Sequence, residues 1–469
     1  MKRFNLFIIL LLALAWSGCS VSKNVPLPNA APETFRDASS TDSAGIGAIS
    51  MKSFMNDQTI QNLIDTALVR NYDMQIALKN IDAAEVLFKQ SKLGNIPELK
   101  LQVTANSTRP SDNSLNGLTL REFVGGTTHI EDYSANAGLF WEADIWGKIR
   151  SQKAAALAAF LQTEEARKAV QTRLVADVAQ GYYNLLKLDA QLEIAKKNLN
   201  LNDSTLSIIN LQFDAGQVTS LAIQQAQALQ LNAAQLIPLL EQNIVLQENA
   251  LSVLIGISPK AVSRGNRLDQ MVVPNDLEAG FPSAMLSRRP DIKSAEFDLD
   301  AANAKVGIAK AGLYPSLVIT ASGGVNSFKA SNWFNVPASL FGLVTGGITQ
   351  PIFQRGQLRS NLDLAKIDRE KKVIQFRQTV LNAVGEVSDE LTKVHKLNSQ
   401  FSIAAKRTQT LQEASKNAGL LFRSGLANYL EVITAQGNLL QSELEMANIK
   451  TEQLDAVVAL YRSLGGGWK

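Results

Sequence analysis

Several stretches of the chain alternate between apolar and polar residues. Between Leu99 and Ser107 the odd positions are apolar and the even ones polar, and most positions from Tyr133 to Asp144 follow the same alternation. A period of two is typical of β-strands that turn one face to an apolar environment. A less regular pair of such stretches follows at 317–326 and 339–350. The pattern predicts four strands in two hairpins, at 99–144 and 317–351.

These strands fit a membrane better than a soluble sheet. Strands of about ten residues with one apolar and one polar face, and with aromatic residues near an end, are typical of transmembrane barrels. A soluble hairpin is the alternative for either pair alone. Four strands cannot close a barrel, and an open sheet edge cannot lie in lipid. The chain must therefore oligomerise if the strands enter a membrane, and three copies would supply 12 strands.

Each strand pair is followed by a long helical pattern. Apolar residues recur every three or four positions from Val170 to Leu199, and again from Val380 to Ala404, without an intervening proline. A spacing near 3.5 indicates coiled-coil packing against a partner helix, and in both cases the next segment of the chain can supply that partner. We expect two long helical hairpins, at 148–256 and 355–464.

The chain also repeats itself. The segment from Arg70 to Leu99 matches the segment from Arg288 to Leu317 without a gap, at an offset of 218 residues. Farther along, Leu211–Gly216 matches Leu420–Gly425 at an offset of 209. A unit of about 200 residues has therefore been duplicated. We expect two repeats, at 54–270 and 271–469, each with a helix, a strand hairpin and a long helical hairpin.

Gly216 and Gly425 occupy equivalent places in the two repeats, between the two helices of each hairpin. Glycine is favoured just beyond a helix C-terminus because it adopts the left-handed conformation at little cost. We expect both glycines at the tips of the hairpins.

The start of the chain resembles the signal of a bacterial lipoprotein. Two basic residues precede the apolar stretch Leu6–Trp16, which is too short for an ordinary membrane span, and small residues lead to Cys19. We expect a signal peptide at 1–18, lipidation of Cys19 and a tether at 19–53 that is rich in Pro, Ala and Ser. The serine after the cysteine suggests sorting to the outer membrane by analogy with enteric bacteria. A plain secretion signal with an incidental cysteine is the alternative.

Composition excludes several classes of protein. The formal net charge is +3 and no long run of one sign occurs, so nucleic-acid binding is not indicated. Two histidines and one cysteine cannot form a His/Cys zinc site or an intrachain disulfide. The nucleophile-elbow, zinc-protease and phosphate-loop motifs are absent, so we expect neither an enzyme nor a cofactor.

Several motifs resemble the TolC/OprM/NodT family of outer-membrane efflux proteins. They are the stretches 288–292, 311–317, 141–147 and 422–430. The resemblance implies an α+β membrane protein that forms a homotrimer, with a 12-stranded barrel in outer-membrane lipid and a 12-helix tunnel in the periplasm. It also implies a periplasmic adaptor (a membrane fusion protein) and an inner-membrane pump of the RND type. The expected cargo is a small molecule such as a drug, a toxic compound or a metal ion. Type I protein secretion and a structural periplasmic coiled-coil lipoprotein are the alternatives.

The same resemblance points to a gate. In the family, the hairpin tips contact the adaptor and narrow the tunnel, and acidic residues often lie six and nine residues after the tip glycine. Counted from Gly425, these positions are Glu431 and Thr434, so one of the two acids is missing here. Leu430 could form an apolar collar beside Glu431. The alternative is that Glu431 is an ordinary solvated residue.

Overall fold

The computed structural model describes residues 24–27, 32, 35, 46–55, 57–123, 128–274 and 282–468. The predicted signal peptide and Cys19 lie outside these residues. The chain divides into two compact units, which we call the sheet unit and the helical unit. The sheet unit comprises Met1–Leu27, Ala83–Leu161 and Phe297–Ile374, and the helical unit comprises Pro28–Asp82, Gln162–Glu296 and Gln375–Lys469.

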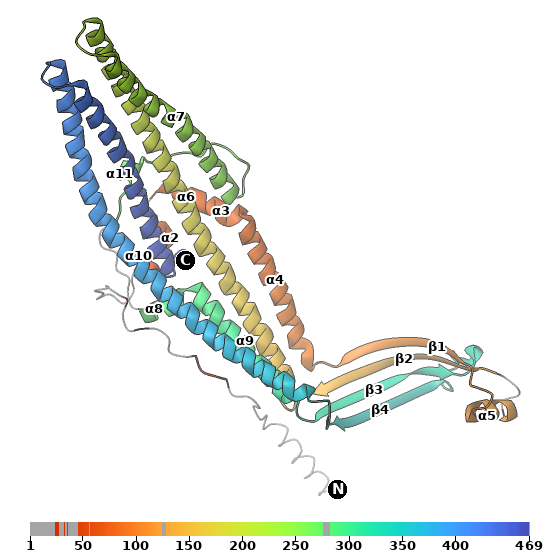
Figure 1. Ribbon diagram of the computed structural model, residues 1–469. Helices are drawn as coiled ribbons and strands as arrows, with labels where there is room; N and C mark the ends of the chain where they lie inside the picture. Colours follow the sequence, from red (N-terminus) through yellow and green to blue (C-terminus); the bar gives the residue numbers. More distant parts are fainter. Residues whose placement is uncertain are drawn as a thin grey trace. The chain divides into compact units, whose positions relative to one another are not determined.

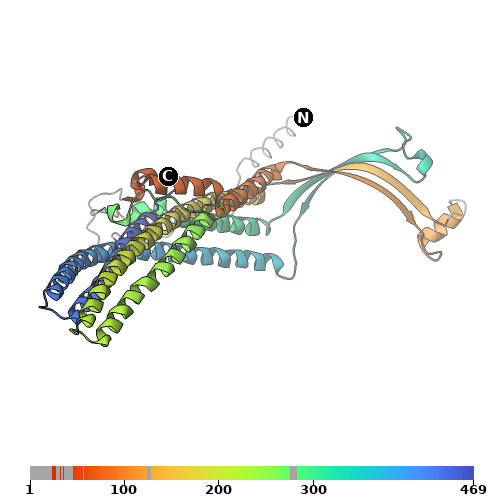
Figure 2. The same cartoon turned by 90° about the horizontal axis from the view of Figure 1, so that it is seen from above.

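The sheet unit contains the four predicted strands in one antiparallel sheet of order β1-β2-β3-β4 (Figure 1). The strands are β1 (Glu98–Thr108), β2 (Ile130–Ala143), β3 (Ser316–Ser327) and β4 (Leu340–Thr349). Each hairpin is the one that the alternation predicts. Strand β2 pairs with β3 and so joins the two hairpins. The sequence pattern did not predict this pairing. Figure 2 shows that the sheet is strongly curved.

The register separates the residues of the sheet into two faces. One row across the four strands consists of Leu99, Leu139, Ala321 and Val344. The next row, on the opposite face, consists of Lys100, Gly138, Ser322 and Leu343. One face is therefore apolar and the other mainly polar, as the period of two predicts.

The connection between β1 and β2 holds a short helix, α5 (Leu115–Phe123), which the sequence pattern did not predict. The Ser114 hydroxyl accepts a hydrogen bond from the Gly117 amide at 3.1 Å, as a residue at a helix N-terminus commonly does. Short 3-10 helices lie at η1 (Ile46–Ala48), η2 (Leu93–Asn95), η3 (Leu268–Gln270) and η4 (Ala330–Asn332).

The two long helical hairpins match each other in length. Helices α6 (Lys148–Asp214) and α10 (Gln357–Arg423) have 67 residues each, and α7 (Ser220–Leu254) and α11 (Tyr429–Ser463) have 35 each. The predicted apolar stripe of α6 is buried, with Val178, Tyr182 and Leu185 fully inaccessible. Within the described ranges, no helix is both long and apolar enough to cross a bilayer.

The single helix that the sequence predicts at the start of each repeat is broken into shorter helices. The observed helices are α2 (Met51–Phe54), α3 (Gln58–Arg70), α4 (Tyr72–Lys92), α8 (Pro282–Arg288) and α9 (Pro290–Ala311). Asn71 restarts the first helix, because its side chain accepts a hydrogen bond from the Met74 amide. Pro290 disfavours the helical conformation at the preceding residue and so ends α8.

The ends of the long hairpins lie against these breaks. Helix α7 is followed by Gly256 and α11 by Gly465, both with positive φ. A Cβ on Gly256 would lie 2.2 Å from the Arg70 carbonyl oxygen, and one on Gly465 would lie 2.9 Å from the Arg288 carbonyl carbon. Both repeats therefore use glycine for the same close contact between hairpin and helix break.

Candidate functional site

The tips of the helical hairpins have the geometry that the sequence predicts. Gly216 has a φ of 75° and donates to the Phe213 carbonyl, while Gln217 donates to the Gln212 carbonyl, both at 2.8 Å. This is a Schellman motif, and Gly425 closes the second hairpin with the same two hydrogen bonds. A Cβ on either glycine would meet no atom within 4 Å, so the backbone conformation, and not space, requires glycine.

The two tips pack against each other through one apolar cluster. The first hairpin contributes Ile209, Ala222 and Ala226, and the second contributes Phe422 and Val432. Burial of apolar side chains from both hairpins fixes the two turns relative to each other. The tips are therefore one surface and not two separate turns.

A buried hydrogen bond also joins the two helical hairpins. The Gln436 side chain donates to the Thr205 hydroxyl at 2.8 Å, and both residues are buried. The Gln436 Oε1 atom is also buried and has no hydrogen-bond partner in the described part of the chain. No pattern in the sequence predicts this contact, since Gln436 only matches Gln227 at the offset of 209 residues.

The candidate gate residues lie on the first turns of α11. Leu430 is 51% exposed, and Glu431 and Thr434 are exposed as well. Thr434 lies near both on the helix surface, because it follows Leu430 by four residues and Glu431 by three. Asn428 caps the helix by accepting a hydrogen bond from the Glu431 amide at 3.1 Å. A carboxylate in the first turn also interacts favourably with the helix dipole.

The two hairpins differ at this position. The residue equivalent to Leu430 in the first hairpin is Leu221, which is also about half exposed. The residue equivalent to Glu431 is Ala222, which is fully buried in the tip cluster. Only the second hairpin therefore presents an acid at this level.

A second group of charged residues surrounds a cavity of about 580 Å³ between α6, α10 and α11. Its lining includes Lys393, Lys396, Glu452 and Asp455. Burial raises the pKa of Asp455 to about 7. The positive charge of Lys187 partly opposes this rise, and the negative charge of Glu452 adds to it. Asp455 therefore changes its charge near neutral pH.

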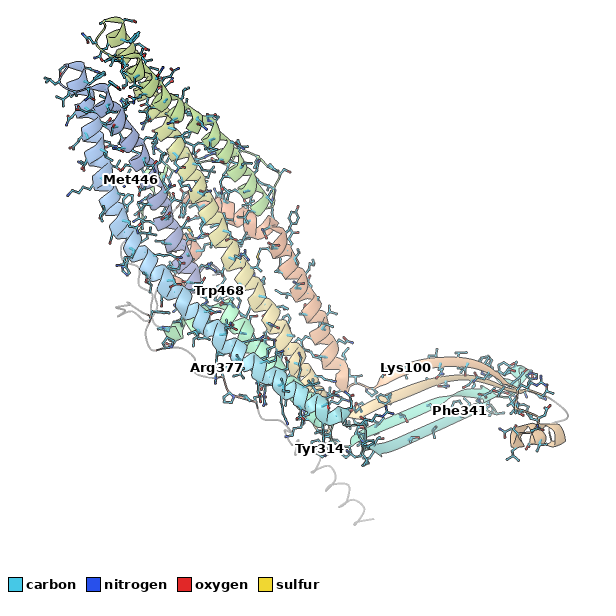
Figure 3. The ribbon with its side chains drawn as sticks, in the orientation of Figure 1. Lys100, Tyr314, Phe341, Arg377, Met446 and Trp468 are labelled. Carbon is cyan, nitrogen blue, oxygen red and sulfur yellow. The ribbon has the colours of Figure 1, made fainter. Side chains whose placement is uncertain are left out.

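The connection from β2 to α6 is built from the motif at 141–147. The Trp146 ring stacks on Tyr314 at 4.7 Å, and its Nε1 donates to the Pro315 carbonyl at 2.7 Å. Asp144 accepts hydrogen bonds from the Ile149 and Arg150 amides and so caps α6. The motif therefore holds together the end of β2, the start of α6 and the connection between α9 and β3, which contains Tyr314 (labelled in Figure 3).

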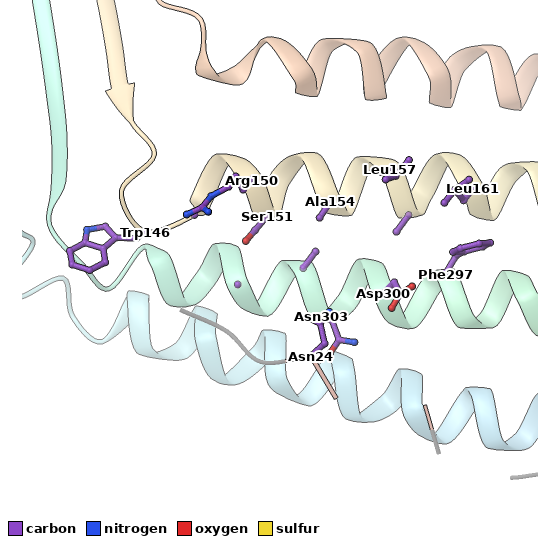
Figure 4. Close-up of a pocket in the computed structure, with 14 residues that line it drawn as sticks. Asn24, Trp146, Arg150, Ser151, Ala154, Leu157, Leu161, Phe297, Asp300 and Asn303 are labelled. Carbon is purple, nitrogen blue, oxygen red and sulfur yellow. The ribbon is translucent and has the colours of Figure 1, made fainter. Parts of the chain in front are cut away.

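A cavity of about 410 Å³ lies between α6 and α9 within the sheet unit (Figure 4). The described segment 24–27 lies against it, because Asn24 lines the cavity and the Val25 amide donates to the Asn303 side chain at 3.2 Å. Asn303 is 3% exposed. Asn24 and Val25 therefore contact the helical part of the sheet unit.

Comparisons with known proteins agree with this geometry. The chain matches the family described as Outer membrane efflux protein over residues 63–257 and 281–466. It is 32% identical over 419 residues to the solvent efflux pump outer membrane protein SrpC of Pseudomonas putida, covering 89% of this chain and 87% of that one. It is 28% identical over 464 residues to the cation efflux system protein CusC of Escherichia coli, covering 97% and 98% of the two chains.

Solved structures show the same fold. The outer-membrane channel OprN superimposes with a TM-score of 0.87 at 25% identity, covering 96% of this chain and all of that one. The MtrE outer membrane channel of Neisseria gonorrhoeae gives a TM-score of 0.85 at 25% identity, covering 96% and 99%. The chain therefore belongs to the family of outer-membrane efflux proteins.

Proposed function

We propose that three copies of this chain form a passive duct through which small molecules leave the cell across the periplasm and the outer membrane. The observation that carries the proposal is the sheet, which has one apolar face, one polar face and two open edges. The long helical hairpins continue from the strands and would extend the duct into the periplasm. The family match in two segments supports a division into repeats at 54–270 and 271–469.

The dimensions of the sheet suit an outer membrane. Strand β1 has 11 residues, and at about 3.3 Å per residue and a tilt of about 40° it would span a band of about 25 Å. Aromatic residues lie near both ends, Trp146 with Tyr314 at one and Tyr133 with Trp333 at the other. Such residues favour the two interfaces of a membrane.

The number of copies follows from the open edges. Unpaired backbone groups cannot lie in lipid, so β1 and β4 must find strand partners. Three chains would give a 12-stranded barrel with the polar face inside. Purified protein in detergent should have the mass of a trimer and should form conducting channels in planar bilayers. A folded monomer that inserts into membranes would contradict the proposal.

The relatives support small molecules as the cargo. SrpC is named for solvents and CusC for cations, which favours small-molecule efflux over protein secretion. We infer an inner-membrane pump as the energy source and a periplasmic adaptor that docks on the hairpin tips. The lumen itself needs neither catalytic residues nor a cofactor.

Cys19 would add a lipid anchor to this assembly, after removal of a signal peptide at 1–18. Asn24 lies only five residues later and lines the same cavity as Trp146, which follows β2, so an acyl chain on Cys19 would remain near the membrane. One acyl chain binds membranes only weakly, and the barrel would provide most of the anchoring. Acyl labelling should disappear in Cys19→Ala while the barrel still inserts. Undiminished labelling would contradict lipidation at this residue.

Substitution of the tip glycines should impair docking of the adaptor. Gly216→Trp and Gly425→Trp would each force a side chain into a left-handed backbone position and enlarge the tip. We expect lower drug or metal tolerance in cells, with the trimer and the barrel intact. Gly419→Trp is the matched control, because Gly419 has helical φ and open space around it. Unchanged tolerance in both tip variants would count against docking at this surface.

Glu431 should determine the ion selectivity of the resting channel. Three copies around a threefold axis would place like charges close together, and such a ring attracts cations. We expect Glu431→Gln to lower cation selectivity and weaken block by multivalent cations in planar-bilayer recordings. Leu430→Ala should raise the basal conductance. Glu413→Gln, an exposed acid on α10, is the control. If Glu431→Gln leaves selectivity unchanged, the constriction lies elsewhere.

A further inference from the structure

The offsets between the repeats relate paired residues in the sheet. Glu98 lies opposite Phe140 in the first strand hairpin. In the second repeat, the offset of 218 relates Glu98 to Ser316 and the offset of 209 relates Phe140 to Thr349, and these two residues also lie opposite each other. A side-chain contact is repeated as well. Trp141 donates to the Asn95 carbonyl at 3.0 Å, and at the equivalent positions Gln350 donates to the Leu313 carbonyl at 3.1 Å. The two strand hairpins are therefore equivalent residue by residue.

The contact between the hairpins has no equivalent within one chain. In β2 and β3, Ala143 lies opposite Leu317. The same offsets relate Ala143 to Ile352 and Leu317 to Leu99, which lie on the β4 and β1 sides of the sheet. Ile352 is 90% and Leu99 is 72% exposed in the single chain. Both edges therefore present exposed apolar residues where the equivalent residues of the β2–β3 contact are partly buried.

We propose that β4 of one copy pairs with β1 of the next in the register of the β2–β3 contact, so that Ile348 lies opposite Val103. The same register places Ile352 opposite Leu99 and Val344 opposite Ser107. This inference rests on the proposed assembly of three copies and specifies its seam. A slip by one residue would turn apolar side chains of one strand toward the polar face of the sheet. The alternatives are therefore slips by two residues.

The seam also has an equivalent of the contact that Trp146 makes. The offsets relate Trp146 to Arg355, Tyr314 to Ile96 and Pro315 to Pro97. The Arg355 guanidinium of one copy would then donate to the Pro97 carbonyl of the next, with its aliphatic part over the exposed Ile96. Arg355 is the one described non-glycine residue with positive φ, at 52°. Such a conformation is costly and persists where surrounding contacts hold it.

Disulfide formation tests the register in the full-length protein in its membrane. Residues opposite each other have Cα atoms about 4.5–5.5 Å apart and diagonal neighbours are about 7–8 Å apart, whereas a disulfide needs less than about 7 Å. Ile348→Cys combined with Val103→Cys should give covalent trimers on a non-reducing gel. Ile348→Cys combined with Leu101→Cys or Ala105→Cys gives controls on the same face, two residues to either side. We expect the opposed pair to cross-link several-fold more than either control, and the single-cysteine variants to give the background.

The outcomes separate the seam from the duct. Preferential cross-linking of a control pair would overturn the register while the assembly stands. No cross-linking above background in any pair, in protein that has the mass of a trimer, would also overturn the proposed register, because β4 and β1 would then be offset by more than two residues, but it would leave the proposed duct. Protein that is monomeric would overturn both.

Arg355 provides a second test. Arg355→Ala should lower the temperature at which the trimer dissociates in detergent, and Arg359→Ala, an exposed arginine four residues later, should not. Arg355→Gly relieves the backbone conformation but removes the guanidinium, so it should also weaken the trimer. Equal dissociation temperatures for Arg355→Gly and the control would overturn the contact with Pro97.

Discussion

A lysine in place of Val103 is expected to prevent stable insertion of the sheet, whereas a lysine at the next residue, Thr104, is expected to be tolerated. Val103 lies on the apolar face of β1 and is 61% exposed, while Thr104 lies on the polar face opposite Ser134. A lysine facing lipid costs about 2–4 kcal/mol near the bilayer centre. Three copies would place three such charges around one barrel.

The measurement is the amount of heat-resistant trimer in the outer-membrane fraction and after folding into lipid vesicles. We expect little or no trimer from Val103→Lys and near-normal amounts from Thr104→Lys. Equal insertion of the two variants would mean that the apolar face of β1 does not contact lipid. Loss of both would point to a general intolerance of charge in this strand.

Arg289→Met is expected to destabilise the helical unit strongly. Arg289 is 8% exposed and donates to both oxygens of Asp291, to Glu386 at 2.8 Å and to the Ser463 carbonyl at 2.7 Å. Burial disfavours the charge of the guanidinium, but Asp291 and Glu386 outweigh that effect and raise the pKa of Arg289. Removal of one partner from a buried ion pair costs about 3–5 kcal/mol, because the other charge remains buried without compensation.

The free energy of unfolding in detergent, measured by denaturant titration, should fall by about this amount. Lys293→Met is the control, because its partly exposed pair with Glu296 should contribute less than about 1 kcal/mol. Burial raises the pKa of Asp291, but the hydrogen bonds and charge of Arg289, together with backbone hydrogen bonds, outweigh burial and hold this pKa below its usual value. The contribution of Asp291 is therefore complete above about pH 4 and is lost as the pH falls through that lowered pKa. The difference between wild type and Arg289→Met should narrow on acidification, and a difference that is already small at pH 7 would contradict the structural role.

Regular elements could be predicted from the sequence because periodicity shows which face of an element is apolar. The alternation from Leu99 to Ser107 arises because one face of β1 is apolar, and the stripe around Tyr182 arises because α6 is packed on one side. Gly216 and Gly425 could be placed at the tips because left-handed backbone is a local requirement. In each case the signal lies within a short segment of the sequence.

The remaining features depend on contacts between distant residues, which leave no period. The break at Asn71 is stabilised by a hydrogen bond to the Leu254 carbonyl, and its equivalent, Arg289, donates to the Ser463 carbonyl. The contact of Gln436 with Thr205 joins residues 231 positions apart. The duplication identifies Asn71 and Arg289 as equivalent positions. It does not predict that one forms hydrogen bonds through an amide and the other through a charged guanidinium.

Among the candidate gate residues, the sequence placed Leu430, Glu431 and Thr434 through their distance from the tip glycine. Their exposure in the structure follows from the cap at Asn428 and from the side of α11 that the tip cluster leaves open. The burial of Ala222 at the equivalent place could not be read from the first hairpin alone, because it depends on packing against the second.

The equal lengths of the two helical hairpins restrict how the molecule can evolve. An insertion in one hairpin alone would carry its tip past the other and separate the side chains that meet there, such as Ile209 and Phe422. A change in length therefore has to occur in both hairpins, and in both helices of each hairpin. It must also preserve the apolar stripe, which favours steps of seven residues, or about 10 Å of helix. Natural variants should therefore differ in the reach of their helical hairpins by discrete, coordinated increments.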